Sequence, residues 1–532
     1  MLGNSKMSLP RLGKWPFSPF SGGRFPVPDR STCLVPEHPP GTGCELPAAG
    51  EKPYSSGLWP EQGAARSMKR ANVVLILTDD QRFDTIAALG NARMKTSNMD
   101  WLAGNGTSFT HAFIPGGTCG AVCMPSRAML HTGRTLFHIA EAGETMPGVH
   151  ATLGQTFRSA GYDAFGVGKW HNGTESYNRS FSGGAEIFFG GMADHWNVPV
   201  FDYDPSGRYD RRCLFIENPF LSNQTRERFC DHIHAGRHST DLVAGAGVEF
   251  LRNHPADRPY LLYLAFLAPH DPRSMPREFL QMYDPADMDL PPNFMPAHPF
   301  DNGDMNVRDE KLAALPRNEA EIRRHLAEYC AMISHLDDRI GWIIEAVRRR
   351  DELDRTIFVL CGDNGLALGQ HGLMGKQNLY EHSVRVPLIF CGPGVPKGRR
   401  LDGLVYLLDV FPTLCELAGI PAPATVEGRS LVPAMRENAA GRKALYLAYR
   451  ELQRGVRTPT HKLIEYVVGG RHVATQLFDM RKDPWEMDNL ADDPACAGIM
   501  AELRREMFRL RDEWGDRQSR WGAIFWEGYG KR

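Results

Sequence analysis

The chain has 532 residues, of which 42% are hydrophobic and 23% charged, and its formal net charge at pH 7 is −2. This length predicts one large domain with a smaller one, and the composition is that of a soluble globular protein. The near-neutral charge argues against nucleic acid or a membrane surface as a partner, and no apolar stretch is long enough to span a bilayer.

The N-terminal region differs from the rest of the chain. Residues 1–67 are rich in Pro, Gly and Ser and show no sustained periodicity, which predicts a disordered extension. The first residues lack the apolar core of a secretory signal, so we expect a cytoplasmic protein. This expectation changes if the start is mis-set, because Met68 begins a plausible alternative start, MKRANVVLIL. Most of the eleven cysteines are expected to be buried thiols, but Cys213 and Cys230 flank a polar loop and could pair in an exported protein.

Buried strands and helices alternate along the middle of the chain. The helical stretches are at 151–161 and 321–350, the second with apolar residues at helical spacing. This alternation predicts a doubly wound α/β fold with a mostly parallel sheet. The predicted strands, all short continuous apolar runs, are 71–77, 162–168, 260–267, 356–362 and 386–392.

The pattern changes after about residue 425. Short strands at 444–450, 461–468 and 475–480 precede a helix near 497–515. These elements predict a small antiparallel sheet with a helix packed on it. We therefore expect a large domain over 68–425 and a C-terminal subdomain over 426–532.

Polar side chains follow four of the predicted strands at the point where each strand ends. They are Asp79-Asp80, Lys169-Trp170-His171, His270-Asp271 and Asp363-Asn364. The carboxyl ends of parallel strands lie at one edge of a sheet and form its ligand-binding side. We therefore expect these four clusters to converge on one site.

The acidic members of this set point to a metal. Asp79, Asp80 and Asp363 supply carboxylates and Asn364 an amide oxygen, and carboxylates this close repel each other unless a cation lies among them. An Asp pair alone more often caps a helix or forms a turn. Because Asp363-Asn364 stands at the end of another strand, the four residues together predict a site for one Ca²⁺, with Mg²⁺ as the alternative.

The basic members point to an oxyanion. Arg127, Lys169, His171, His270 and Lys376 can line a pocket for an anion whose leaving group needs a proton. Any one of them alone would more often be a solvated surface residue. His371 and His382 are left as such surface residues, with His371 the better candidate for a contact with the site.

Cys123 opens the segment CMPSRAMLHTGR, and four interpretations compete for it. A core thiol would have apolar neighbours, and a disulfide with Cys119 would close a very tight loop. A thiolate nucleophile needs a base, and the usual cysteine-hydrolase patterns are absent. The fourth interpretation is a cysteine that is chemically converted before use.

This segment resembles the signature of the sulfatase family, Cys-x-Pro-Ser-Arg-x-x-x-x-Thr-Gly-Arg. The other motifs follow the family's order, and the resemblance covers about residues 70 to 495. Met124 fills a position where a small residue is often seen. The signature positions are Cys123, Pro125, Ser126, Arg127, Thr132, Gly133 and Arg134, with Pro125 expected near the start of a short helix that ends at Gly133.

The resemblance implies an alkaline phosphatase-like fold and the hydrolysis of a sulfate ester to an alcohol and inorganic sulfate. Cys123 would be oxidised to formylglycine by a maturation enzyme, and the metal would bind its hydrate. His270 would protonate the leaving alcohol, with Lys376 as the competing candidate, and His171 would be the base that allows sulfate to leave. Lys169 would stabilise the sulfuryl oxygens together with Lys376 and the metal, and Arg127 would hydrogen-bond the diol.

Two alternatives remain open at this point. A phosphonate or phosphate ester hydrolase shares the fold and the formylglycine, although such relatives tend to have histidine at the position of Asn364. A catalytically silent module that binds sulfated glycans would lack at least one residue of the site. This sequence contains all of the residues that the site requires.

The substrate implied is a sulfated carbohydrate, with choline sulfate and aryl sulfates as alternatives, and the oligomeric state is open. Residues 172–240 either line a sugar-binding cleft or form an ordinary insertion. The aromatic residues on which this choice depends are Tyr177, Phe181, Trp196, Tyr203 and Tyr209.

Overall fold

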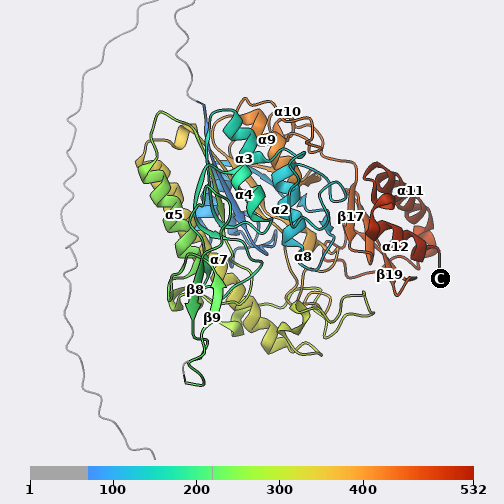
Figure 1. Cartoon of the computed structure of the whole chain (residues 1–532). Coiled ribbons are helices and arrows are strands. Elements are labelled where there is room, and N and C mark those ends of the chain that lie inside the picture. Colours follow the sequence, from blue (N-terminus) through green and yellow to red (C-terminus); the bar gives the residue numbers. More distant parts are fainter. Residues whose placement is uncertain (1–69, 219, 532) are drawn as a thin grey trace, which may run out of the picture. The chain divides into compact units, whose positions relative to one another are not determined.

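The structure, a computed structural model, describes residues 70–218 and 220–531, so the extension predicted at 1–67 and the alternative start at Met68 lie outside it. An eight-stranded sheet forms the centre, in the order β15-β2-β14-β12-β1-β11-β5-β6 (Figure 1). Its strands are β1 (Asn72–Thr78), β2 (Gly106–Phe109), β5 (Asp163–Lys169), β6 (Gly183–Phe188), β11 (Tyr260–Ala265), β12 (Thr356–Gly362), β14 (Leu388–Cys391) and β15 (Arg399–Leu401).

The sheet is mostly parallel, as the sequence predicts. Strands β12, β1, β11, β5 and β6 run in one direction. The run predicted at 386–392 forms β14, which lies antiparallel to both β12 and β2. All residues of β1 are buried, which explains its continuous apolar sequence.

Helices cover both faces of this sheet. Val73, Leu75 and Leu77 of β1 belong to a core with residues of α2 and α9, whereas Val74 and Ile76 belong to a core with residues of α5 and α7. Figure 1 shows α5 and α2 on opposite sides of the sheet. The helices are α2 (Cys123–Thr132), α3 (Leu153–Ser159), α5 (Ser239–Asn253), α7 (Glu319–Arg349) and α9 (Val410–Leu417).

The long helix predicted over 321–350 is α7, and that predicted over 151–161 is the shorter α3. Side chains cap both: Asn318 accepts a hydrogen bond from the backbone N–H of Glu321, and Thr152 accepts one from Gln155. None of the helices in the described part of the chain is long and apolar enough to cross a bilayer.

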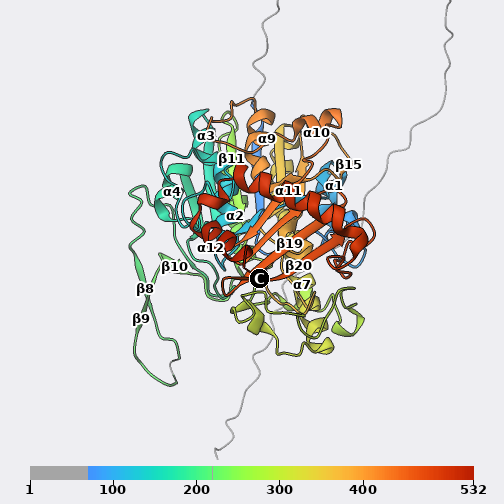
Figure 2. The same cartoon turned by 90° about the vertical axis from the view of Figure 1, so that its right-hand side faces the viewer.

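A second sheet forms in the C-terminal part. Strands β17 (Leu445–Tyr449), β18 (Gln453–Arg457), β19 (His461–Val468) and β20 (Arg471–Asp479) are antiparallel, as predicted. Their sheet gains a fifth strand, β4 (Gly116–Gly117), which pairs parallel with β17 and precedes Cys123 in the chain. Helix α11 (Ala497–Glu513) lies across the sheet beside α12 (Arg520–Tyr529), which the sequence analysis did not predict (Figure 2).

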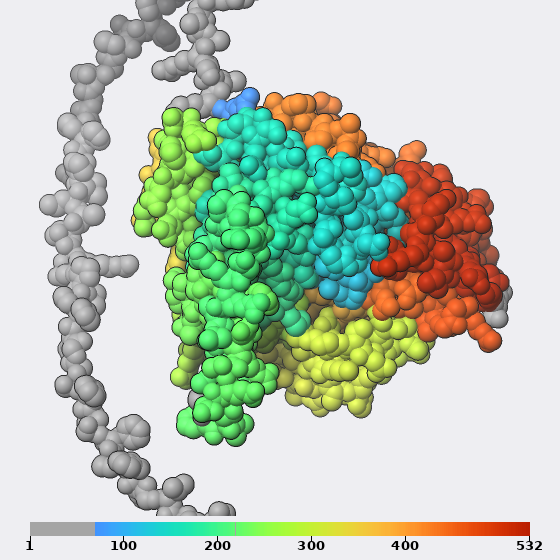
Figure 3. Space-filling model, in the orientation of Figure 1, coloured from blue at the N-terminus to red at the C-terminus, as the bar shows by residue number. Residues whose placement is uncertain are grey.

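A hairpin of β8 (Arg212–Phe215) and β9 (Arg226–Phe229) projects from the surface (Figure 3). Cys213 and Cys230 lie at its base, and both carry free thiols. The apolar cysteines expected to be buried, Cys361, Cys391 and Cys415, are buried.

Candidate active site

The acidic residues of the site follow the two central strands of the sheet. The backbone N–H of Asp363, after β12, donates to the carbonyl of Thr78 at the end of β1 over 3.0 Å. The N–H of Asp80 donates to Asp363 Oδ1 over 3.1 Å. The pairing of the two strands therefore continues past their ends and fixes the aspartates side by side.

Two residues of the site hold a backbone conformation that non-glycine residues rarely adopt. Asp80 has φ of 65° and His171 has φ of 71°. Such strained residues persist where the surrounding structure fixes them, and they concentrate at functional sites. Here each one lies two residues past the end of a strand, β1 for Asp80 and β5 for His171.

Cys123 is the first residue of α2, and Gly133 ends this helix in the left-handed conformation, as the signature predicts. Its Sγ lies 3.4 Å from His171 Nδ1 and 3.6 Å from Lys169 Nζ. Burial raises the pKa of the thiol, against the opposing charges of Lys169 and Lys376. A thiol with a raised pKa is a poor nucleophile, which disfavours the thiolate interpretation.

Arg127 lies one turn after Cys123 and is fully buried. Its Nε donates to Asp363 Oδ2 over 2.9 Å, and its Nη1 donates to the carbonyl of Lys169 over 2.6 Å. Its Nη2 lies 3.7 Å from Asp79 Oδ2. Arg127 therefore connects α2 with the ends of three strands.

Two lysines complete the charge pattern. Lys169 Nζ pairs with Asp79, and Lys376 Nζ donates to Asp80 Oδ1 over 2.5 Å. Burial raises the pKa of Asp79, but the charge of Lys169 and those of its neighbours outweigh this effect and lower it well below its usual range. Burial and the Asp79 carboxylate raise the pKa of Asp363. The carboxylates thus compete for the available positive charge.

The residues present fit a hard cation. Asp79 Oδ1 and Asn364 Oδ1 are buried and have no hydrogen-bond partner. Asp79, Cys123 and Asp363 place potential ligand atoms within 4.8 Å of one another. Oxygen donors and unpartnered buried oxygens are what a Ca²⁺ or Mg²⁺ site requires.

A cavity of about 360 Å³ opens onto this group. Cys123, His171, His270 and Lys376 line it. His270 Nε2 lies 3.7 Å from Asp80 Oδ2, and its Nδ1 lies 2.8 Å from the carbonyl of Asp271. The structure thus brings every predicted catalytic and metal-binding residue to one edge of the sheet.

The sequence analysis missed several residues of this cavity. Its wall includes Gly191 and Met192, together with Arg308, Asp309 and Gln377. Gln377 follows Lys376 directly, so the lysine motif could have indicated it. The segment around Arg308 shows no sequence signal, because it reaches the site through a loop between β11 and α7.

His371 and His382 are not solvated surface residues, so that expectation was wrong. Both are buried, and the His371 ring stacks on Tyr380 with 3.9 Å between centroids. Burial lowers the pKa of His371 to about 3 and lowers that of His382 strongly. Neither lines the cavity beside Cys123.

The aromatic residues of 172–240 do not form a sugar-binding cleft. Tyr177 and Phe181 are fully buried and pack against Trp170, and Tyr203 and Tyr209 pack against Tyr177. Trp196, the fifth of the aromatics considered, contacts His238 instead. From this region the cavity receives Gly191 and Met192.

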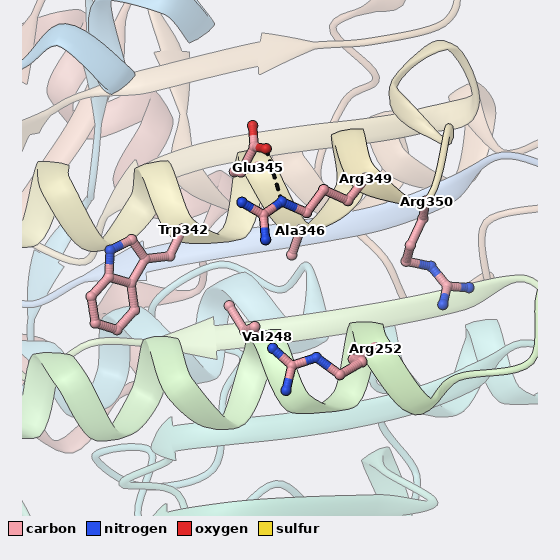
Figure 4. A pocket seen from close by; sticks show the side chains of 7 residues that line it. All are labelled: Val248, Arg252, Trp342, Glu345, Ala346, Arg349 and Arg350. Atoms are coloured by element: carbon pink, nitrogen blue, oxygen red, sulfur yellow. Dashed lines mark hydrogen bonds and ion pairs between the residues drawn. The ribbon is translucent and has the colours of Figure 1, made fainter. Parts of the chain in front are cut away.

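A different cavity, of about 440 Å³, lies between α5 and α7 (Figure 4). Its walls come from the C-terminal halves of both helices, which lead back to the starts of β11 and β12. It therefore lies toward the opposite edge of the sheet. It is lined by Val248, Arg252, Trp342, Glu345, Ala346, Arg349 and Arg350, which include no nucleophile.

The fold and the site define an alkaline phosphatase-like hydrolase. The sulfatase family profile matches residues 71–420, and the profile described as N-sulphoglucosamine sulphohydrolase, C-terminal, matches residues 369–513. The chain therefore belongs to the sulfatase family and is a sulfuric ester hydrolase.

Related proteins align with this chain over most of their own length. An arylsulfatase of Clostridium perfringens is 28% identical over 480 residues, which cover 83% of this chain and 94% of the relative. An N-acetylglucosamine-6-O-sulfatase of Bacteroides thetaiotaomicron is 24% identical over 525 residues, covering 84% and 87%. A solved structure of a protein with its substrate D-glucosamine-2-N,6-O-disulfate has a TM-score of 0.69 at 22% identity, covering 84% of this chain and 99% of that one.

Proposed function

We propose that this enzyme hydrolyses the sulfate ester of a carbohydrate, with Cys123 oxidised to formylglycine and a Ca²⁺, or alternatively Mg²⁺, bound beside it. One observation carries the proposal: the Cys123 side chain lies at a helix N-terminus, in contact with Lys169 and His171. Buried oxygens without partners lie in the same group of residues, on Asp79 and Asn364. A formylglycine-generating maturation enzyme is then a required partner.

The formylglycine and the cation would each supply one part of the chemistry. The hydrated aldehyde offers two hydroxyls on one carbon, so that one can take up the sulfuryl group and the other can drive its release. A cation held by Asp79, Asp80, Asp363, Asn364 and residue 123 supplies positive charge that acidifies a hydroxyl and offsets the charge of the ester. An unmodified serine has one hydroxyl and an unmodified cysteine one thiol, so neither offers a second group on the same carbon to drive the release.

The lysines would act on the sulfuryl group. Lys169 Nζ lies 3.6 Å from the sulfur of Cys123, and Lys376 lines the same cavity. Both are buried, so their charges act in a low dielectric where they stabilise developing negative charge strongly. Arg127 would hold Asp363 and the end of β5 in place, as its hydrogen bonds indicate.

The histidines would move protons. His171 Nδ1 is 3.4 Å from the side chain of residue 123, within reach of a hydroxyl placed there. We therefore assign it as the base that allows sulfate to leave. His270 lines the cavity and would protonate the leaving alcohol, with Lys376 as the competing candidate.

The carbohydrate substrate is supported by the cavity wall and by relatives. Arg308, Asp309 and Gln377 add hydrogen-bonding groups of the kind that recognise sugar hydroxyls. Among curated relatives, the protein from Bacteroides thetaiotaomicron is named for a sulfated sugar. Choline sulfate and simple aryl sulfates remain the smaller alternatives.

The test is sulfate release from a panel of defined sulfated sugars, choline sulfate and an aryl sulfate, using protein produced with a maturation enzyme. Mass analysis of the peptide bearing residue 123 reports the conversion of Cys123 in the same sample. We expect turnover of at least one sulfated sugar, in proportion to the converted fraction. Fully converted, calcium-loaded protein that hydrolyses no member of the panel would favour the silent glycan-binding alternative.

The phosphonate or phosphate ester hydrolase is the second candidate. Asn364, just after β12, disfavours this second function, because phosphonate and phosphate ester hydrolases of this fold tend to have histidine at that position. Comparing an aryl sulfate with the matching phosphate monoester and phosphonate separates the two. We expect the sulfate to be the best substrate of the three.

A further inference from the structure

A second group of metal-binding side chains lies outside the active site. Glu186, His232 and His234 place potential ligand atoms within 4.8 Å of one another. None of them belongs to the catalytic group, and none lines the cavity at Cys123. The group lies where the outermost strand of the large sheet, β6, meets the base of the β8–β9 hairpin.

The backbone aims these side chains at one point. In the pairing of β5 with β6, Val167 faces Ala185 and Gly168 faces Ile187, so Glu186 is the extra residue of a β-bulge. Its φ of 50° is unusual for a glutamate. Bulges commonly re-aim a side chain, and strain of this kind persists where a function needs it.

His232 belongs to β10 (His232–Ile233), which pairs antiparallel with β7 (Pro199–Val200), and His234 directly follows β10. His232 and His234 are two residues apart, the spacing that brings side chains of extended backbone to one side. Their ring centroids are 4.5 Å apart. Both therefore reach the carboxylate of Glu186.

The contacts leave the inner atoms without hydrogen-bond partners. His234 Nε2 lies 3.0 Å from Glu186 Oε1, and His232 Nε2 lies 3.6 Å from Glu186 Oε2. Yet Glu186 Oε2 and both Nε2 atoms are buried and accept or donate no hydrogen bond. Three converging donor atoms of this kind are costly to bury unless an ion or a proton lies among them.

We propose that Glu186, His232 and His234 form a binding site for a zinc-type divalent cation. Two imidazoles and one carboxylate suit Zn²⁺, whereas Ca²⁺ prefers oxygen ligands alone. Tetrahedral zinc with bonds of about 2.0–2.1 Å holds its ligands roughly 3.3 Å apart. Small side-chain movements would bring the three atoms to that spacing.

A neighbouring carboxylate supports the assignment. Asp202 Oδ2 lies 3.8 Å from His232 Nδ1, the nitrogen that faces away from Glu186. A carboxylate that accepts a hydrogen bond from this nitrogen orients a metal-bound imidazole and increases its basicity, and a rotation of the exposed Asp202 side chain toward the ring would form that bond. The backbone N–H of Asp202 donates to Asp231 Oδ2 over 2.9 Å, which ties the segment after β7 to the residue before β10.

A metal ion at this site would hold two segments of the chain together. The chain continues from Glu186 through β6 to Gly191 and Met192 in the wall of the catalytic cavity. His232 lies three residues past the end of the hairpin strand β9. A bound ion would tie the base of the hairpin to this wall and hold the wall in one position.

The experiment is a Zn²⁺ titration of the full-length protein after chelator treatment, carried out in excess Ca²⁺ so that the catalytic site is filled. Calorimetry gives the stoichiometry, and visible absorption with Co²⁺ as a substitute reports the coordination geometry. We compare the wild type with the His232→Ala/His234→Ala double variant, with Glu186→Gln, and with His461→Ala as a matched control outside the cluster.

We expect one Zn²⁺ per chain in the wild type and in His461→Ala, and none in the double variant. Asp202→Asn should weaken binding about 10-fold to 100-fold while the fold is kept. A wild type that binds no Zn²⁺ in excess Ca²⁺ would show that the group is only a histidine–carboxylate pair. Equal Zn²⁺ binding by the wild type, the double variant and Glu186→Gln would also overturn the proposal. If the double variant fails to fold, Glu186→Gln, which keeps the shape of the side chain, carries the test of the site.

Discussion

Two buried clusters of charge behave differently in this protein. At Asp516, which joins the C-terminal sheet to its helices, both carboxylate oxygens accept hydrogen bonds. It accepts from Arg454 Nε and Nη2 over 2.7 and 2.8 Å, from the Tyr446 hydroxyl over 2.7 Å and from Trp526 Nε1 over 2.8 Å. At the catalytic edge, oxygens of Asp79 and Asn364 have no partner.

This difference in hydrogen bonding distinguishes a cluster that stabilises the fold from one that serves the reaction. A fully hydrogen-bonded buried ion pair fixes the packing of the elements that supply it. A cluster with unpartnered oxygens and competing carboxylates is poised for an ion or a reacting group. The expected consequence is that changes at Asp516 affect folding, whereas changes at the catalytic edge affect turnover.

The largest effect is expected at Cys123. Cys123→Ala removes the residue that we propose is converted to formylglycine, so sulfate release should fall to the background rate. The thermal unfolding midpoint should stay close to that of the wild type, because the helix around residue 123 keeps its other contacts. Residual turnover that scales with enzyme concentration would contradict this role.

The opposite pattern is expected at Arg454. Arg454→Met leaves the carboxylate of Asp516 buried without its charge partner, which should lower the free energy of unfolding by about 3–5 kcal/mol. Chemical denaturation measures this loss. At a temperature where the variant is folded, kcat should match the wild type, and a comparable fall in kcat would remove the distinction between the two clusters.

Lys169 tests the electrostatic part of the catalytic edge. Lys169→Met should lower kcat by about 10²–10³-fold, because it removes the buried charge that we propose acts on the sulfuryl oxygens. Lys482→Met, at an exposed lysine, serves as the control. If KM rises while kcat is unchanged, Lys169 binds the substrate without stabilising the transition state.

Calcium should stabilise the catalytic edge alone. Added at about 100 times its dissociation constant, it should raise the free energy of unfolding by about 2.7 kcal/mol. This increment should persist in Arg454→Met and disappear in Asp79→Asn/Asp363→Asn. Parallel calorimetric titrations measure binding directly, and an unaltered increment in the double variant would place the ion elsewhere.

The smallest effect concerns His131, a buried group that belongs to neither cluster. Burial and the charge of Arg127 lower its pKa to about 3 from 6.5. The unfolded chain binds the proton more readily, so the histidine's contribution to stability is full above pH 6.5 and is lost as the pH falls toward 3. His131→Phe should remove about 1.4 kcal/mol of the stability lost between pH 7 and pH 5.5. Denaturation curves at both pH values decide this, and equal losses in both proteins would refute it.

Much of the fold follows from local sequence patterns. The buried strands are continuous apolar runs, and α7 shows helical spacing over its whole length. The direction of β14 and the addition of β4 to the C-terminal sheet depend on contacts between distant segments. No local pattern encodes such contacts, so these features were not predicted.

The site shows the same limit. Side chains at strand ends were predictable because the edge of a parallel sheet gathers them, whatever their separation in the chain. Arg308 and Asp309 reach the cavity from the start of a short 3-10 helix, η3 (Asp309–Leu312), between β11 and α7, and their sequence gives no sign of it. Tyr177 and Phe181 left the choice between a cleft and an ordinary insertion open, because an aromatic-rich segment looks the same whether it lines a cleft or fills a core.

The most direct test of the account is a crystal structure of the mature, calcium-loaded enzyme with anomalous scattering measured to locate calcium. We expect one calcium peak bounded by Asp79, Asp80, Asp363 and Asn364, with an oxygen in place of sulfur on the side chain of residue 123. A calcium peak elsewhere, or an intact thiol at residue 123 in enzyme that releases sulfate, would contradict it.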